Sequence, residues 1–87
     1  MPMELEQLRQ LDAIARTGTF SAAADELHTS QPSISRSMRA LERELGCEIV
    51  IRTRKGVRFT PEGELALERT AQARRELELL RRELGAS

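Results

Sequence analysis

The 87-residue sequence contains one cysteine and one histidine, and this scarcity excludes two large classes of small protein. Cys47 has no second cysteine to pair with, so the chain is not a domain held by internal disulfides. The same counts exclude a zinc site built from four cysteine and histidine ligands. No metal or cofactor site is therefore predicted. Cys47 itself is expected to be a small core residue rather than a reactive thiol.

Long apolar stretches are also missing. No run approaches the ~18 residues that a membrane-spanning helix requires, and 32% of the residues are charged. Residues 1–4 have neither the basic start nor the apolar segment of a secretory signal, so the cytoplasm is the expected location. A chain this short has room for one domain and no deep catalytic cleft. Because it also has no glycine-rich phosphate loop, it is predicted not to be an enzyme.

The sequence has no net charge, because 14 basic side chains balance 14 acidic ones. The charges are nevertheless unevenly distributed. Residues 28–58 contain seven basic and three acidic side chains, net +4, whereas residues 1–27 have a net charge of −3 and residues 59–87 of −1. Affinity for phosphates follows the local patch rather than the total. The middle of the chain is therefore the candidate surface for a nucleic acid.

Apolar spacing predicts a first helix over about residues 4–17, ended by Gly18. Its expected apolar stripe consists of Leu5, Leu8, Leu11, Ile14 and Ala15. Ser21 is the expected N-cap of a short second helix over about residues 21–27. Three consecutive alanines in that helix would let another helix approach closely.

A third helix is predicted over about residues 31–45, capped by Ser30 and ended by Gly46. Between the second and third helices, a short polar turn contains His28. Thr60 and the proline after it begin a long fourth helix that reaches about residue 84.

A run rich in β-branched residues, a turn at residues 53–56 and a second short run predict a hairpin between the third and fourth helices. The predicted fold is mainly α, a winged helix-turn-helix with three helices and a two-stranded wing, followed by a long linker helix for dimerisation. The expected division is a DNA-binding domain over residues 3–60 and the linker helix over residues 61–84. Within the domain, the helix-turn-helix covers about residues 21–45 and the wing about residues 48–59.

The third helix can be divided into two faces at 100° per residue. The side expected to face the core consists of Ile34, Met38, Leu41 and Leu45. The outward side consists of Pro32, Ser33, Arg36, Arg39, Ala40 and Arg43. This outward face is basic and has no bulky side chain, so it can enter the major groove of DNA. Arg36 can bond both acceptors of one guanine.

Other polar residues would then contact bases or phosphates. Gln31, Ser33 and Ser35 can bond base edges or phosphates, and Ser30 can reach a phosphate at the helix N-terminus. The residues expected to neutralise phosphates are Arg39, Arg43, Arg52, Arg54 and Lys55. The wing residues among them could instead be a solvated turn, and outward arginines are often only solvated. The combination of a short alanine-rich helix, a polar turn and a basic hairpin favours DNA docking.

The segment from Phe20 to Gly46 resembles the N-terminal domain of LysR-type transcriptional regulators. The resemblance is carried by the Ser-Gln-Pro turn at residues 30–32, followed by Leu-Glu and Leu-Gly, and it continues through Thr60-Pro61-Glu62-Gly63. It implies that Gln31, Pro32, Ser33, Ser35 and Arg36 contact bases or backbone and that Lys55 reaches the minor groove. A small-molecule effector would act only through a C-terminal domain that this chain does not contain, so we expect it to be an excised DNA-binding domain.

The long fourth helix has a seam of small residues followed by leucines at four- and three-residue steps. Its members are Ala66, Thr70, Ala73, Leu77, Leu80 and Leu84. Packing on its own domain can account for the first two turns only. The resemblance implies that the remainder pairs with a second copy as a homodimer, and so that the operator in double-stranded DNA is partly palindromic.

Two other binding functions are consistent with a winged helix. A regulator of another family would keep the DNA contacts and change the dimer. A protein-interaction module would use the leucine seam and bind no DNA, but its third helix should then be acidic or apolar on the outside. For His28, a local hydrogen bond is expected rather than a DNA contact.

Overall fold

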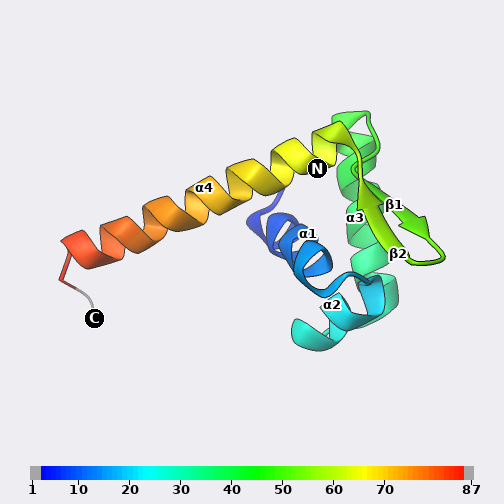
Figure 1. Cartoon of the computed structure of the whole chain (residues 1–87), viewed down its shortest axis with the longest axis horizontal. Coiled ribbons are helices and arrows are strands. Elements are labelled where there is room, and N and C mark those ends of the chain that lie inside the picture. Colours follow the sequence, from blue (N-terminus) through cyan, green and yellow to red (C-terminus); the bar gives the residue numbers. More distant parts are fainter. Residues whose placement is uncertain (1–2, 86–87) are drawn as a thin grey trace.

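The computed structural model describes residues 3–85, which form four helices and one two-stranded antiparallel sheet (Figure 1). In chain order the elements are α1 (Leu5–Thr17), α2 (Phe20–Glu26), α3 (Gln31–Leu45), β1 (Val50–Thr53), β2 (Gly56–Phe59) and α4 (Pro61–Glu83). This order confirms the predicted winged helix-turn-helix followed by a long helix. None of the helices within residues 3–85 combines the length and the hydropathy needed to cross a membrane.

The core lies where α1 contacts α2, α3 and α4. Leu11 and Ile14 of α1 have no exposed surface, and Ile34 of α3 is equally buried. The rest of the core consists of Ala13, Phe20, Ala23, Ala24, Met38, Leu41, Ile49 and Val50. Cys47 lies half-buried against this core. The inward face predicted for α3 is confirmed through Leu41.

Three residues expected in the core are exposed instead. Leu5 lies in the first turn of α1 and is 67% exposed, and Leu45 at the end of α3 is 44% exposed. Both line the groove between α1 and α4 and do not belong to the core. Ala15 is exposed as well, because the side of α1 that faces its neighbours is centred on Leu11 and Ile14 and includes Gln10 rather than Ala15.

The predicted N-cap of the second helix is wrong by two residues. Thr19, not Ser21, caps α2: its Oγ1 accepts a hydrogen bond from the Ala22 amide at 3.0 Å. Ser21 is exposed within the first turn. Starting the helix at Phe20 turns that ring into the core, where it is 4% exposed. Burial of the aromatic ring therefore decides between the two capping candidates that flank it.

The turn between α2 and α3 depends on the backbone of His28, which takes a φ of 57°. Its amide donates to the Asp25 carbonyl at 3.3 Å, and the Thr29 amide donates to the Ala24 carbonyl at 2.9 Å. These are main-chain hydrogen bonds, and the His28 imidazole, for which a local hydrogen bond was expected, is exposed. The turn sets the angle between the two helices.

The wing pairs Val50 with Phe59 at its base and Thr53 with Gly56 at its tip. The first strand begins at Val50, two residues after the predicted start of the wing. Gly56 has a φ of 129°, and a Cβ there would lie 2.8 Å from the Gly18 carbonyl oxygen. A glycine is therefore required both by the turn and by the close approach of the wing to the end of α1.

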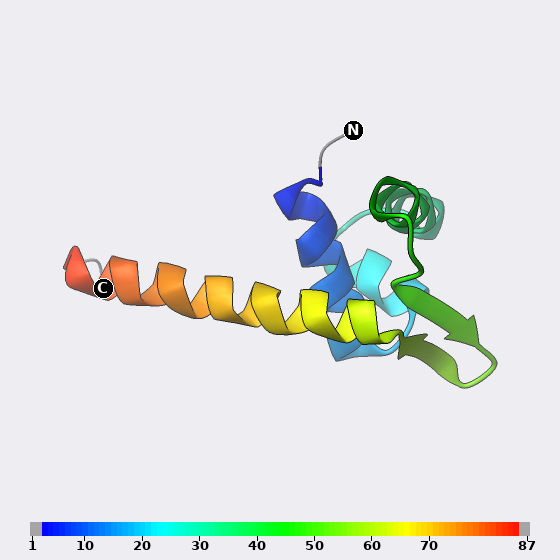
Figure 2. The same cartoon turned by 90° about the horizontal axis from the view of Figure 1, so that it is seen from above.

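The helix α4 is attached to the domain by its first turns and then leaves it (Figures 1 and 2). The Thr60 side chain caps the helix by accepting from the Gly63 amide at 3.0 Å, as predicted. Gly63 and Thr70 are the buried residues of α4 among those described, and Ala73 and the residues that follow it are exposed. The end of the seam, at Leu80 and Leu84, therefore projects from the domain.

A charged cluster that the sequence analysis did not identify connects three helices. The carboxylate of Asp12 on α1 accepts hydrogen bonds from Arg16 at 3.0 Å and from Arg74 of α4 at 2.7 Å. Arg16 also forms an ion pair with Glu26 of α2. The hydrogen bond from Arg16 lowers the pKa of Glu26 below its ordinary value, while the bonds to Glu26 and Asp12 raise the pKa of Arg16. The contribution of Glu26 to stability is present above its ordinary pKa and is lost as the pH falls through the lowered value.

We predict that Gly63→Ala lowers the free energy of unfolding by about 2–3 kcal/mol. A Cβ at this position would lie 2.2 Å from the Ile49 carbonyl oxygen, so α4 would have to shift away from the segment before β1. Alanine otherwise stabilises a helix interior by about 1 kcal/mol over glycine, so the sign of the change is diagnostic. The measurement is urea unfolding at one protein concentration.

The matched control is Gly46→Ala. Gly46 has a φ of 72° but no heavy atom within 4 Å of the added Cβ, so only conformational strain of about 1 kcal/mol is expected. A Gly63→Ala variant that loses no more than this control would contradict the close contact.

Candidate nucleic-acid interface

The start of α3 brings three of the predicted DNA contacts together. Ser30 caps the helix by accepting from the Ser33 amide at 3.2 Å, and its hydroxyl donates to Ser33 Oγ at 2.9 Å. Arg36 Nη2 donates to the same Ser33 oxygen at 3.4 Å. The three side chains therefore form one line along the outer face of the first turns. Ser30 acts as the cap in addition to its predicted role at a phosphate.

Four of the six residues on the outward face predicted for α3 are exposed. Pro32, Arg36, Arg39 and Arg43 are exposed, whereas Ser33, Ser35 and Ala40 are partly buried. The opposite face is held by the core residues and by Gln7 of α1, whose Nε2 donates to the Ser37 carbonyl at 3.3 Å. A face that is open and basic on a helix held in this way can approach a polyanion without rearrangement of the fold.

Glu42 connects α3 to the wing, and the sequence analysis did not assign it any role. Its Oε2 accepts from the Ile49 amide at 2.8 Å and from the Val50 amide at 3.2 Å. A carboxylate that accepts two amide bonds fixes the entry of the wing relative to α3. The signal in the sequence was that Glu42 directly follows Leu41, which was predicted to face the core. In the structure, Glu42 is half-buried.

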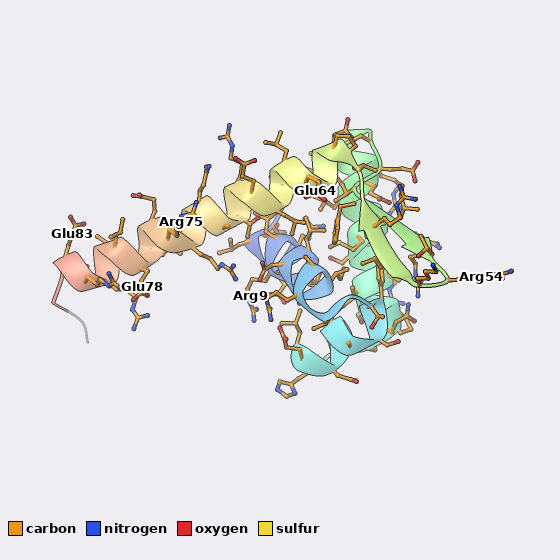
Figure 3. The ribbon with its side chains drawn as sticks, viewed as in Figure 1. Arg9, Arg54, Glu64, Arg75, Glu78 and Glu83 are labelled. Carbon is orange, nitrogen blue, oxygen red and sulfur yellow. The ribbon has the colours of Figure 1, made fainter. Side chains whose placement is uncertain are left out.

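The tip of the wing carries Arg54 and Lys55, which are both exposed. Arg54 points away from the helices at the far end of the hairpin (Figure 3). Thr53 closes the turn, since its Oγ1 donates to the Gly56 carbonyl and accepts from the Lys55 amide, both at 3.2 Å. Arg58 on β2 is a further exposed cation on the wing that was not among the predicted contacts.

Arg52 lies differently from the other wing cations. Its Cζ lies 4.4 Å from the centre of the Phe20 ring, in cation–π contact with α2. Because a guanidinium has only donors, the side-chain oxygen of Gln31 faces it and accepts from Nη1 at 3.2 Å and from Nη2 at 3.1 Å. Arg52 therefore joins the wing to the first residue of α3. The two-residue period of a strand could have indicated this, since it places Arg52 on the same face as buried Val50.

An apolar groove runs between α1 and α4 at the other side of the domain. Four residues of the predicted seam line it, together with leucines of α1: Leu5, Leu8, Ala66, Thr70, Ala73 and Leu77. Thr70 is 8% exposed, and its hydroxyl donates to the Ala66 carbonyl at 2.8 Å. Leu80 and Leu84 lie farther along α4 and are 49% and 75% exposed. The seam thus begins in the groove and continues on the projecting part of α4.

The interface and the projecting helix lie at opposite ends of the molecule. The two views agree that α3 and the hairpin are neighbours at one end, while the C-terminal end of α4 lies at the other (Figures 1 and 2). The extents are 44 × 27 × 24 Å, and α4 accounts for most of the longest one.

The sequence matches the family model described as "Bacterial regulatory helix-turn-helix protein, lysR family" over residues 5–64. A relative among curated proteins is the HTH-type transcriptional regulator TcbR of Pseudomonas sp. (strain P51), 46% identical over 77 residues. That alignment covers 88% of this chain and 25% of TcbR, so the chain spans about a quarter of the relative's length.

Two solved structures of DNA complexes are similar to the chain. The DNA-binding domain of CbnR with DNA has a TM-score of 0.76 and 44% identity, covering 93% of this chain and 90% of that one. The DNA-binding domain of BenM with benA site 1 DNA has a TM-score of 0.84 and 31% identity, covering 95% and 93%.

We expect Glu42→Ala to lower the free energy of unfolding by about 2 kcal/mol, because the Ile49 and Val50 amides would lose their acceptor. Hydrogen exchange at these two amides should accelerate more than exchange in α1. The matched control is Glu44→Ala, an exposed glutamate on the same helix, for which a change within about 0.5 kcal/mol is expected. Equal losses in the two variants would rule out the anchoring role.

Proposed function

This chain belongs to the LysR family of bacterial regulatory helix-turn-helix proteins, and from that premise we propose that it binds double-stranded DNA sequence-specifically as the DNA-binding domain of a transcriptional regulator. The observation that best supports this proposal is the exposed basic face of α3 beside a basic wing, in a fold similar to two domains solved with DNA. The unit proposed to bind DNA is residues 3–60, with α4 as its linker.

The residues on that face have separate tasks in the proposal. Arg36 and Ser33 read base edges in the major groove, and Arg39 and Arg43 anchor phosphates farther along α3. The remaining proposed contacts are Ser30, Gln31, Pro32, Ser35, Arg52, Arg54 and Lys55. Of these, Lys55 at the wing tip is placed to approach the adjacent minor groove.

We further propose that the chain forms a homodimer through α4 and recognises a partly palindromic operator. The support is the apolar groove between α1 and α4, which lies next to exposed leucines on the projecting helix. Leucines that are half exposed or more along one seam are typical of a helix that packs against another chain. Two connected domains bind one operator at a high effective concentration, so dimerisation would raise the affinity.

The relatives are named as transcriptional regulators, and we propose no catalytic role for this domain. A regulator that binds a bacterial chromosome works in the cytoplasm, and any small-molecule effector is assigned to a C-terminal domain outside these 87 residues. The alternative of a protein-interaction module without DNA binding gains no support, because the outward face of α3 is basic and exposed.

We predict that Arg36→Ala lowers specific binding by about ten- to a hundredfold, since a bidentate contact with guanine contributes roughly 1–3 kcal/mol against the wrong base. Binding to random DNA should fall much less. The measurement is the ratio of affinities for an operator fragment, found by footprinting, and for random duplex at one salt concentration. Arg43→Ala is the control, because loss of a phosphate anchor weakens both affinities alike. An unchanged ratio in Arg36→Ala would mean that Arg36 only anchors a phosphate.

Leu80→Asp should convert dimers into monomers in sedimentation while the helical circular dichroism of the domain persists. The control is Leu79→Asp: Leu79 is as exposed as Leu80, at 49% each, but lies outside the proposed seam. A carboxylate buried between two helices is costly, whereas one beside the seam stays hydrated. Dimers that survive Leu80→Asp and dissociate in Leu79→Asp would place the interface on another face of α4.

A further inference from the structure

We propose that Arg52 is a positioning residue for DNA recognition, which holds the side-chain oxygen of Gln31 so that Gln31 presents only its NH2 group to DNA. This inference rests on the proposed function and extends it to the chemistry that Gln31 can recognise. Gln31 would then select a hydrogen-bond acceptor on DNA and disfavour a donor.

The guanidinium of Arg52 stacks on an aromatic ring, which restricts its orientation. Arg52 lies on the face of β1 that also carries buried Val50, and it pairs across the hairpin with Val57, which packs against the core. Its Cζ lies 4.4 Å from the centre of the Phe20 ring, which is 4% exposed and belongs to the first turn of α2. A rigid ring beneath a planar cation restricts where its N–H groups point.

Those N–H groups converge on one acceptor. Both terminal nitrogens lie within 3.2 Å of one terminal atom of the Gln31 amide, which is assigned as the oxygen because a guanidinium can only donate. Gln31 is the first residue of α3, directly before the exposed Pro32, and is itself partly buried. Hydrogen bonds from a charged donor are stronger than those between neutral groups, so the amide is held in one orientation before DNA arrives.

This orientation changes what Gln31 can read. A free glutamine offers one acceptor and two donors and can pair bidentately with adenine, accepting from N6 and donating to N7. With its oxygen bound to Arg52, Gln31 retains only donors. The bases whose major-groove edges offer acceptors without a donor are guanine, through O6 and N7, and thymine, through O4. Cytosine offers only a donor there, and adenine loses its second bond.

The same geometry assigns Arg52 a role different from that of Arg54. Arg54 points away from the helices at the wing tip, where a phosphate contact would act on all sequences alike (Figure 3). Arg52 would act through Gln31, so its removal should change base preference. The two arginines carry the same charge on the same hairpin and therefore form a matched pair of sites for substitution.

The first arm of the test uses the free protein and no DNA. In the ¹⁵N-labelled chain, the Gln31 side-chain NH2 signals, assigned by their loss in Gln31→Ala, should shift in Arg52→Met and stay in place in Arg54→Met. Methionine keeps an unbranched stem over the Phe20 ring, so folding should persist. NH2 signals that do not move in Arg52→Met would overturn the proposal.

The second arm selects binders from synthetic duplexes randomised in sequence. The base pair at which Gln31→Ala loses preference marks the Gln31 contact. Arg52→Met should lower that preference on the order of tenfold, whereas Arg54→Met should weaken all sequences equally. Adding Arg52→Met to Gln31→Ala should cause no further loss of preference.

Each outcome of the selection has one meaning. Preference kept in Arg52→Met, or losses that add in the double variant, would each overturn the positioning role. A wild-type chain that enriches no sequence would instead contradict the proposed function. In that case the signals of the first arm still decide whether Arg52 holds Gln31.

Discussion

The peptide groups around Ile49 hold the parts of this small domain together. The Ile49 amide donates to Glu42 on α3 at 2.8 Å, and its carbonyl accepts from the Thr60 amide, which begins α4, at 3.1 Å. The side chain is 1% exposed in the core, and the carbonyl lies so close to Gly63 that no larger residue fits there. One residue thus fixes the third helix, the wing and the linker relative to one another. It therefore contributes to the common orientation of the basic surfaces on α3 and the wing.

The neutral net charge is compatible with a basic interface because several acidic side chains are used inside the protein. Asp12 and Glu26 pair with arginines on the α1 side of the domain, and Glu42 accepts from two amides of the wing entry. Their charges are compensated locally and do not face a ligand of α3. Arg36, Arg39 and Arg43 remain exposed on α3. The sum of charges therefore says less about the partner than their distribution does.

Local signals allowed most of the fold to be predicted. Ser30, Thr60 and Gly46 cap helices as expected, because capping depends on a few adjacent residues. Thr19 was missed, since burial of the neighbouring Phe20 decides where α2 begins. The Glu42, Asp12 and Arg52 contacts link residues distant in the sequence, and no local pattern states which ones meet. The family and fold are confirmed, whereas the DNA contacts and the dimer seam stay predictions at residue level.

The ion pair between Arg74 and Asp12 lies close to the point where α4 leaves the domain. Beyond it the helix continues for nine residues to Glu83, about 14 Å at 1.5 Å per residue. Such a rod acts as a lever: a tilt of about 15° at the ion pair moves its tip by ~3.5 Å, close to the 3.4 Å rise of one base pair along a DNA strand. A change at this one ion pair would therefore be enlarged, at the end of the helix, to the spacing of one base pair.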